Sequence, residues 1–340
     1  MALIAIAVNP DSGRDIRRLV SHATVYSNLD KTNTAERIIL AASQLGEHRF
    51  AIMPDSYHFG YRIIRRLEED LHFIPTGIVF VADTPRSETA EDTVDFSRWA
   101  EEQGAAVLIV LGGDGTCRAA AKGITKTPLI SLSTGTNNVF PEMVEGTVAG
   151  MAASALADKV ADPSNCGSRC KRIEVYLNRE LVDIALVDAV FSGYTYIGSK
   201  AIWNRDDIQR VVACQCHPAT IGFSSLLGST LTILPDDDFG AAAECVPGEP
   251  NVRASLAAGV ISPFRLERIQ TLPLDNMQIW KMDNAGTLAL DGEREVRWDC
   301  GDEVGLKIVR NGPIRLDLRK VLVSAQRAGY FRLSPSGGKG

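Results

Sequence analysis

Hydrophobic and polar positions follow two different patterns along the chain, and the pattern changes near residue 162. Before that point, short and almost continuously apolar runs alternate with longer segments whose apolar positions repeat with a helical period. Buried strands that alternate with amphipathic helices are typical of a parallel sheet with helices on both faces. We therefore predict strands at residues 3–8, 51–54, 77–82, 106–111 and 129–132, and helices at residues 35–45, 61–71, 89–103, 116–122 and 144–160.

After residue 165, short alternating runs separated by turn residues replace the helical segments, which predicts a mainly β domain. We predict a hairpin from residues 172–177 and 180–190, and strands at residues 230–234, 277–282, 287–290, 295–298, 304–309 and 314–318. The predicted fold class is thus an α/β domain with a parallel, Rossmann-like sheet at residues 1–162, followed by a β-rich domain at residues 166–320. For the C-terminal segment, 321–340, we expect a tail that frays or packs back on the first domain.

Composition narrows the class of protein. The 340 residues are enough for about two domains, and the net charge of −6 predicts no nucleic-acid partner. The first apolar run ends at Asn9-Pro10 and is too short for a signal peptide or a membrane span, so we expect a cytoplasmic protein with no membrane span. The seven cysteines should then be reduced.

The strongest chemical signal is a glycine cluster between a buried strand and a helix. Gly112, Gly113 and Gly115 permit positive φ angles and let the backbone approach a ligand, and Thr116 opens the helix, whose N–H groups can bind phosphate. Asp114 is the only acid of this loop, suited to hold a magnesium ion or to accept a proton from an attacking hydroxyl. A glycine-rich turn with an Asp helix cap is the alternative.

Polar loops also follow two other predicted strands of the first domain. In a parallel sheet, ligands bind beyond the carboxyl ends of the strands, so three such loops together favour a phosphate-rich ligand, although each alone also fits an ordinary capped turn. The Asp291-Gly292-Glu293 turn is a fourth candidate, with a plain hairpin turn as its alternative. The candidate phosphate-binding residues in the two loops are Asn9, Ser12, Gly13, Arg14, Thr134, Gly135, Thr136, Asn137 and Asn138.

These segments resemble the superfamily of NAD kinases and diacylglycerol-type lipid kinases. The resemblance rests on Gly-Gly-Asp-Gly-Thr at 112–116, the loop at 9–13 and the Asp-Gly-Glu at 291–293. Within the superfamily, residues 9–19, 133–141 and 290–295 are most similar to the acetoin catabolism protein X group. The resemblance spans residues 3 to about 320, and it implies an NAD kinase-type nucleotide-binding domain, a β-rich second domain and an active site in the cleft between them.

The resemblance also implies roles for single residues. In NAD kinases the acid that matches Asp114 contacts the ribose 2′-hydroxyl and is the presumed base. An Asn-acid pair grips the nucleoside there, and its nearest match is Val187-Asp188, which keeps only the acid. The stretch Gly135–Asn138 is similar to the Gly-Thr-x-Asn-Asp stretch of lipid kinases, but Asn138 replaces its acid.

From the resemblance and the loops together we expect phosphoryl transfer from ATP or polyphosphate to a hydroxyl of a nucleotide. NAD is the candidate acceptor, and a link to acetoin catabolism is implied. Mg2+ would be held by Asp114, shared with Asp188 or Glu293, while Arg14 offsets phosphate charge. Two alternatives stay open: a regulatory protein that binds a nucleotide or dinucleotide without turnover, and a lipid kinase-like enzyme.

Other site classes are disfavoured. The stretch at 193–200 reverses the Lys-Ser order of a Walker loop, and Arg118 stands where a dinucleotide fingerprint needs its last glycine. Zinc binding by thiols lacks a standard ligand spacing. The strand edges of a β-rich domain allow self-association, so a homo-oligomer is one expectation. The thiol and imidazole groups considered for zinc belong to Cys166, Cys170, Cys214, Cys216 and His217.

Overall fold

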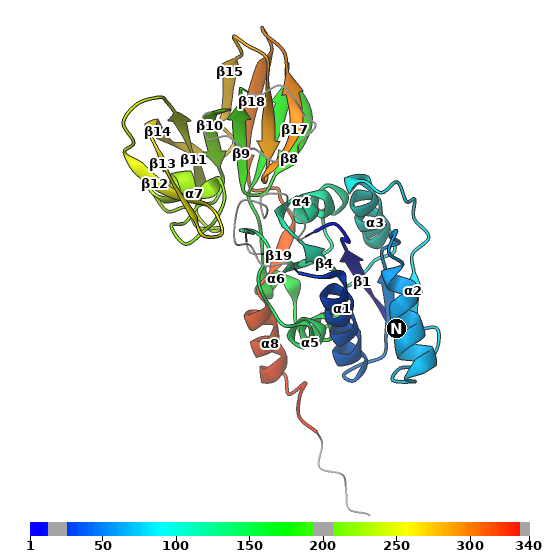
Figure 1. The fold of residues 1–340 in the computed structure, drawn as a ribbon. Helices are drawn as coiled ribbons and strands as arrows, with labels where there is room; N and C mark the ends of the chain where they lie inside the picture. Colours follow the sequence, from blue (N-terminus) through cyan, green and yellow to red (C-terminus); the bar gives the residue numbers. More distant parts are fainter. Residues whose placement is uncertain (13–25, 136, 194–206, 334–340) are drawn as a thin grey trace, which may run out of the picture.

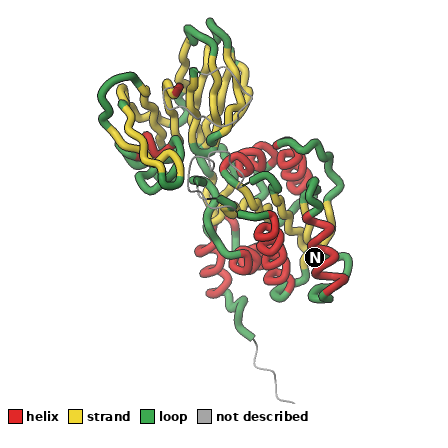
Figure 2. Tube along the Cα trace, viewed as in Figure 1, coloured by secondary structure: helices red, strands yellow, loops and turns green. Residues whose placement is uncertain are grey.

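The computed structural model describes residues 1–12, 26–135, 137–193 and 207–333. Most helices lie in one body and most strands in the other (Figures 1 and 2). The first body is built on a mostly parallel sheet and the second on antiparallel sheets, so the predicted fold class is confirmed. No helix in the described ranges has the length and apolar character needed to cross a membrane.

The first sheet places three strand ends side by side. Its order is β3-β2-β1-β4-β5-β19-β6, and every pair is parallel except β19 with β6. Because β1, β4 and β5 are adjacent and parallel, the loops that follow them lie at one edge of the sheet. The strands are β1 (Ala2–Val8), β2 (His48–Ile52), β3 (Val79–Val81), β4 (Val107–Gly112), β5 (Leu129–Ser133), β6 (Gly167–Arg169) and β19 (Ile314–Leu316).

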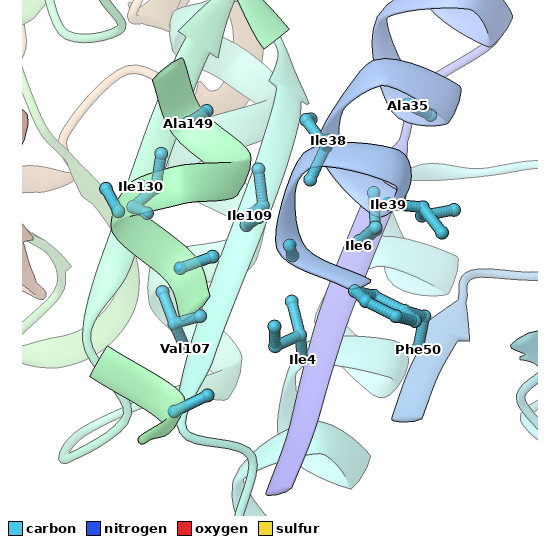
Figure 3. Close-up of a cluster of buried hydrophobic side chains, with 14 of the residues drawn as sticks. Ile4, Ile6, Ala35, Ile38, Ile39, Phe50, Val107, Ile109, Ile130 and Ala149 are labelled. Atoms are coloured by element: carbon cyan, nitrogen blue, oxygen red, sulfur yellow. The ribbon is translucent and has the colours of Figure 1, made fainter. Parts of the chain in front are cut away.

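Helices cover both faces of this sheet. On one face, Ile38 of α1 and Ala149 of α5 pack on side chains of β1 and β4 (Figure 3). Val321 of α8 belongs to the same buried cluster. On the other face, Phe96 of α3 and Cys117 of α4 pack on the alternate side chains. The helices are α1 (Asn28–Ser43), α2 (Phe59–Ile64), η2 (Arg65–Asp70), α3 (Ala90–Glu102), α4 (Asp114–Gly123), α5 (Gly146–Ala157), α6 (Pro163–Cys166) and α8 (Leu318–Arg327).

Two predicted helices differ from the observed ones. The helix predicted at 35–45 begins at Asn28, because Ser27 and Asp30 form a capping box that starts it earlier than its apolar face does. The helix predicted at 61–71 is α2, which continues into the π-helical segment η2.

The second domain is a sandwich. A six-stranded sheet, in the order β14-β11-β10-β9-β16-β17, packs against a four-stranded sheet, β15-β18-β7-β8, around buried residues such as Phe191, Trp298 and Leu306. A two-stranded ribbon, β12-β13, and α7 (Ser224–Gly228) cover the other face of the larger sheet. The strands are β7 (Arg172–Leu177), β8 (Glu180–Ala185), β9 (Asp188–Ser192), β10 (Ile208–Ala213), β11 (Phe239–Cys245), β12 (Val252–Ala257), β13 (Val260–Phe264), β14 (Leu266–Pro273), β15 (Met277–Lys281), β16 (Gly286–Leu290), β17 (Glu293–Trp298) and β18 (Glu303–Val309).

Two strand predictions in this half were wrong, and a third strand pairs with the first sheet. The run 180–190 is two strands in different sheets, interrupted where Asp291 takes the backbone N–H groups of Leu186 and Val187. Residues 230–234 form a loop with one isolated bridge, between Ile233 and Cys216. The strand predicted at 314–318 is present as β19, but it pairs with β5 and β6 of the first sheet and not with the sandwich.

The chain therefore returns to the first domain after the sandwich. The helix α8 packs on α5 and α6, with Val321 and Ala325 fully buried. Beyond α8, the Tyr330 hydroxyl donates to Asp158 Oδ2 and lies 2.8 Å from the Ser154 hydroxyl. Residues 314–330 thus cover the edge of β5 and one side of α5.

Candidate functional site

The three polar loops predicted to share a ligand are hydrogen-bonded to one another. Asn9 Nδ2, after β1, donates to Thr116 Oγ1 at 2.8 Å in the first turn of α4. Thr134, after β5, donates from its hydroxyl to Ser12 Oγ at 2.9 Å and from its backbone N–H to Gly112 O at 3.2 Å. One connected and largely buried network of polar side chains therefore lies at this edge of the sheet.

Little space is left for side chains at Gly112 and Gly113 of the 112–116 loop. None of the three is among the residues with positive φ, so the expected left-handed conformation is not what selects them. A Cβ on Gly112 would lie 2.6 Å from Thr116 Oγ1, and a Cβ on Gly113 would lie 2.9 Å from Asn138 Oδ1. A Cβ on Gly115 would lie 3.4 Å from Glu293 Oε1, which brings the turn of the second domain against this loop.

Asp114 is the first residue of α4, and only 9% of it is exposed. Its carboxylate accepts the backbone N–H groups of Val139, at 3.0 Å, and Phe140, at 2.8 Å. Asp114 therefore joins the glycine loop to the loop after β5 through these hydrogen bonds.

The loop after β5 is also held internally. Asn138 Nδ2 donates to Ser133 Oγ at 2.8 Å, and Ser133 Oγ donates to Gly135 O at 2.8 Å. Asn137 lies in the same turn and makes polar contacts of its own. Among the predicted site residues, Gly13, Arg14 and Thr136 lie outside the described residues, as does most of the 193–200 stretch.

The Asp291-Gly292-Glu293 segment is a tight hairpin turn between β16 and β17. Asp291 and Gly292 have φ angles of 50° and 89°, as in a turn with two left-handed central residues. The Asp291 carboxylate accepts the N–H groups of Val187, at 2.8 Å, and Asp188, at 3.2 Å, in addition to that of Leu186. Asp291 thereby fixes the start of β9, where the buried Asp188 lies.

Burial raises the pKa of Asp291 to about 6. Arg118 and the three backbone N–H groups act in the opposite direction but do not compensate for the lost solvent. Carboxyl groups with a pKa raised toward neutrality occur at functional sites and also in structural ion-pair networks.

Arg118 is a residue of this region that the sequence analysis did not select. It lies one turn after Asp114 on α4, is 4% exposed, and donates to Asp183 Oδ2 at 3.3 Å and to Glu295 Oε1 at 3.0 Å. Lys122, on the same helix, lies 2.6 Å from Asp183 Oδ1. These ion pairs join α4 to β8 and β17 of the second domain. In the sequence, the four-residue spacing of Arg118 and Lys122 was the only sign that these side chains share one face of the helix.

Lys31 was also missed. It lies in the first turn of α1, fully buried, with its ammonium against the loop 9–12. A lysine near the start of an amphipathic helix is usually exposed, so its sequence carried no signal for this position.

The described residues contain no group of three or more His, Cys, Asp or Glu side chains arranged to hold a metal ion. Five of the cysteines are buried: Cys117, Cys166, Cys170, Cys214 and Cys216. Burial, followed by the negative charge of Asp114, raises the pKa of the Cys117 thiol well above its usual range. This thiol is therefore protonated and packs as an apolar side chain behind the glycine loop.

A cavity of about 510 Å³ lies at the same sheet edge, beyond β2 and β3. Asp55, His58, Tyr61, Thr84 and Arg86 are among its lining residues. The rings of His58 and Tyr61 are 6.0 Å apart, centre to centre. Its volume falls in the range of small-molecule pockets.

Comparison with known proteins agrees with this architecture. The family model for the ATP-NAD kinase N-terminal domain matches residues 4–160, and the model for the acetoin catabolism protein X C-terminal domain matches residues 171–311. Acetoin catabolism protein X of Cupriavidus necator is 31% identical over 342 aligned positions, which cover 98% of this chain and 95% of the relative. The resemblance seen in the sequence is confirmed.

Among solved structures, yeast NADH kinase in complex with NADH superposes with a TM-score of 0.52 at 14% identity, covering 100% of this chain and 90% of the kinase. A putative diacylglycerol kinase from Bacillus anthracis str. Sterne gives a TM-score of 0.43 at 10% identity, covering 92% of this chain and 97% of that protein. The yeast enzyme shows that the fold of this chain is NAD kinase-like.

Proposed function

Because this chain belongs to the acetoin catabolism protein X family, we propose that it transfers a phosphoryl group from ATP or polyphosphate to a hydroxyl group of a nucleotide, in connection with acetoin catabolism. NAD is the acceptor we propose. The proposal depends on one observation: the polar loops that follow β1, β4 and β5 are hydrogen-bonded to one another at one edge of the sheet. Glu293 of the second domain lies against Gly115 of the middle loop.

This arrangement suits a reaction that depends on positioning and charge. Phosphoryl transfer needs little covalent help from the protein, and N–H and hydroxyl groups around Gly113 and Thr116 can bind the donor phosphates. The acceptor hydroxyl forms a bond to the terminal phosphorus while the bond to the leaving phosphate oxygen breaks. Asp114 orients this hydroxyl and takes its proton, in the role we propose for it.

Magnesium fits this site only as an ion carried by the nucleotide. The described side chains build no three-ligand metal cage, whereas Mg2+ in kinases commonly uses one or two carboxylates together with substrate phosphates. Asp114 would hold it together with Glu293, whose carboxylate lies against Gly115. When bound, the ion neutralises charge on the transferred phosphoryl group.

The cavity beyond β2 and β3 is the place we propose for a further part of the nucleotide. It opens at the same sheet edge, and His58 and Tyr61 offer aromatic surface while Asp55 offers a carboxyl group. Burial raises the pKa of the Asp55 carboxyl group, although hydrogen bonds from the backbone of residues 57–59 lower it.

The test is NADP formation from NAD by the purified protein with magnesium and either ATP or polyphosphate. Asp114→Asn is expected to lower turnover by about 100-fold or more, since it removes the proton acceptor. Asp92→Asn is the matched control, because Asp92 is also buried and accepts backbone N–H groups, of Ser87 and Glu88, at the start of another helix. Absence of NADP with both donors contradicts the proposal.

A second candidate function, nucleotide binding without turnover, is favoured by one observation. The Asp114 carboxylate is engaged by the N–H groups of Val139 and Phe140, as expected of a group that holds a loop. Calorimetry with NAD and ADP separates the two functions. Binding without NADP formation, with affinity kept in Asp114→Asn, indicates a regulatory binding protein.

A further inference from the structure

Lys31 carries a fully buried ammonium group directly beneath the loop that follows β1. Its Nζ donates to three backbone carbonyls of that loop, those of Asn9, Pro10 and Ser12, at 2.9, 2.8 and 2.7 Å. It also donates to Asn28 Oδ1 at 3.1 Å. Burying an ammonium group is costly, so these short contacts imply a strict geometric requirement.

The start of α1 delivers Lys31 to this position. Ser27 and Asp30 form a reciprocal capping box that fixes the first turn of the helix. Lys31 follows at once, on the face of α1 that packs against the sheet. The capped first turn of α1 therefore fixes the position of the Lys31 ammonium group against the loop 9–12.

The contacts control which groups the loop presents. A phosphate is repelled by carbonyl oxygens and attracted by N–H and hydroxyl groups. The carbonyls of Asn9, Pro10 and Ser12 accept from Lys31, while the Asn9 side-chain amide donates to Thr116 and the Ser12 hydroxyl accepts from Thr134. The same residues whose carbonyls bind Lys31 thus connect to the glycine loop and to the loop after β5.

We propose that Lys31 is a positioning residue of the phosphate site: it turns the carbonyls of Asn9, Pro10 and Ser12 away from the bound phosphate group of the nucleotide. This inference rests on the proposed function for its ligand, but not on turnover. Lys31 does not touch the phosphate, and its effect passes through Asn9 and Ser12.

The chain contains a matched control. Lys171, in the second domain, is also buried and donates to two backbone carbonyls, of Leu234 at 3.1 Å and Phe239 at 2.8 Å. Replacing either lysine by methionine keeps the aliphatic stem and removes the ammonium. Both variants lose a buried cation and its carbonyl contacts, but only Lys31→Met disturbs the loop after β1.

The experiment measures binding of inorganic pyrophosphate by calorimetry, together with thermal unfolding, for the wild type, Lys31→Met and Lys171→Met. We expect Lys31→Met to weaken pyrophosphate binding by about tenfold or more, as for the loss of one or two hydrogen bonds in a site. Lys171→Met should lower the unfolding temperature and leave the affinity unchanged.

A second variant covers the case in which Lys31→Met does not fold. Asn28→Asp is isosteric, and Asn28 Nδ2 has no hydrogen-bond partner among the described residues, so no bond is lost. An acid in the first turn of a helix is favourable, so this variant should fold. Its carboxylate attracts the ammonium away from the carbonyls, and we expect pyrophosphate binding to weaken by about threefold or more.

The outcomes separate this inference from the proposed function. Unchanged affinity in Lys31→Met or in Asn28→Asp, or equal weakening in Lys31→Met and Lys171→Met, overturns the role of Lys31. A wild type that forms NADP but does not bind pyrophosphate overturns it as well and leaves the function standing. A wild type that binds pyrophosphate in a manner dependent on Lys31, without forming NADP, supports the inference and contradicts the kinase.

Discussion

Glu101 and Asp291 hold neighbouring loops by the same device, in different parts of the molecule. Glu101, at the end of α3, accepts the N–H groups of three consecutive residues, 125–127, just as Asp291 accepts those of 186–188. Yet the pKa of Glu101 is lowered to about 2, whereas that of Asp291 is raised to about 6.

The difference lies in solvent. For Glu101, burial raises the pKa, but the Thr125 hydroxyl and the three N–H groups together outweigh it. Asp291 is enclosed between the two domains, where burial exceeds the combined effect of Arg118 and its N–H donors. The same set of three N–H donors therefore surrounds two carboxyl groups of different pKa. Glu101, nearer the solvent, has a lowered pKa, whereas Asp291, at the domain junction, titrates near neutrality.

The largest expected effect comes from Asp291→Ala. Three buried N–H groups lose their acceptor, so we expect the free energy of unfolding to fall by about 3 kcal/mol in urea unfolding at pH 5, where the folded carboxyl group is mostly protonated. Asp275→Ala is the control, because Asp275 has a φ of 62° but is exposed, and so it reports the left-handed strain alone. Equal losses in the two variants would show that the backbone conformation matters and the hydrogen bonds do not.

Arg118→Met tests the role of the domain junction. The change leaves Glu295 without this cation and Asp183 with Lys122 alone, and we expect a loss of about 2 kcal/mol of unfolding free energy. The pKa of Asp291 should rise further, because Arg118 lowers it. Arg98→Met, which breaks the exposed pair with Asp95, should cost much less. Similar losses in both variants would contradict a special role for the junction.

The smallest expected effect is a difference between Asp291 and Glu101 in how each makes the free energy of unfolding depend on pH. The folded pKa of Asp291 exceeds the unfolded value, so its contribution should make the unfolding free energy fall by about 1 kcal/mol per pH unit between pH 4 and 6. The contribution of Glu101 has the opposite sign: it is complete above its unfolded pKa and is lost as the pH falls toward 2.

Urea unfolding from pH 2 to 8 should therefore show two different changes. Asp291→Asn should remove the decline between pH 4 and 6, and Glu101→Gln should remove the loss at lower pH. An unchanged profile in Asp291→Asn would mean that its pKa is not raised.

The parts of the molecule that follow from local pattern were predictable from sequence. The strands around Ile6 and Ile109 are apolar throughout because helices cover both faces, and their polar loops stand out for that reason. The glycine loop was also predictable. Gly112 and Gly113 leave room for the side chains of Thr116 and Asn138, however, and do not adopt the positive φ angles for which glycine was expected.

What could not be predicted depends on partners distant in sequence. From sequence alone, Lys31 and Arg118 are expected at the surface. Only the folded chain places backbone carbonyls next to Lys31 and carboxylates next to Arg118. The strand at Phe239–Cys245 is rich in alanine and glycine, so its apolar alternation is weak, and its partners β10 and β14 decide its structure. The pairing of β19 with β5 leaves no local trace at all.

That pairing gives the protein an unusual order of assembly. During synthesis the ribosome releases β1 to β5 first, but the strand that protects the open edge of β5 and the helix that seals α5 emerge only after the whole sandwich. Until then the nascent first domain exposes an unpaired strand edge beside an apolar helix, a combination prone to aggregation. The segment 314–330 completes the first domain when it pairs with β5 and packs on α5. The sandwich is then connected to the first domain at both of its ends.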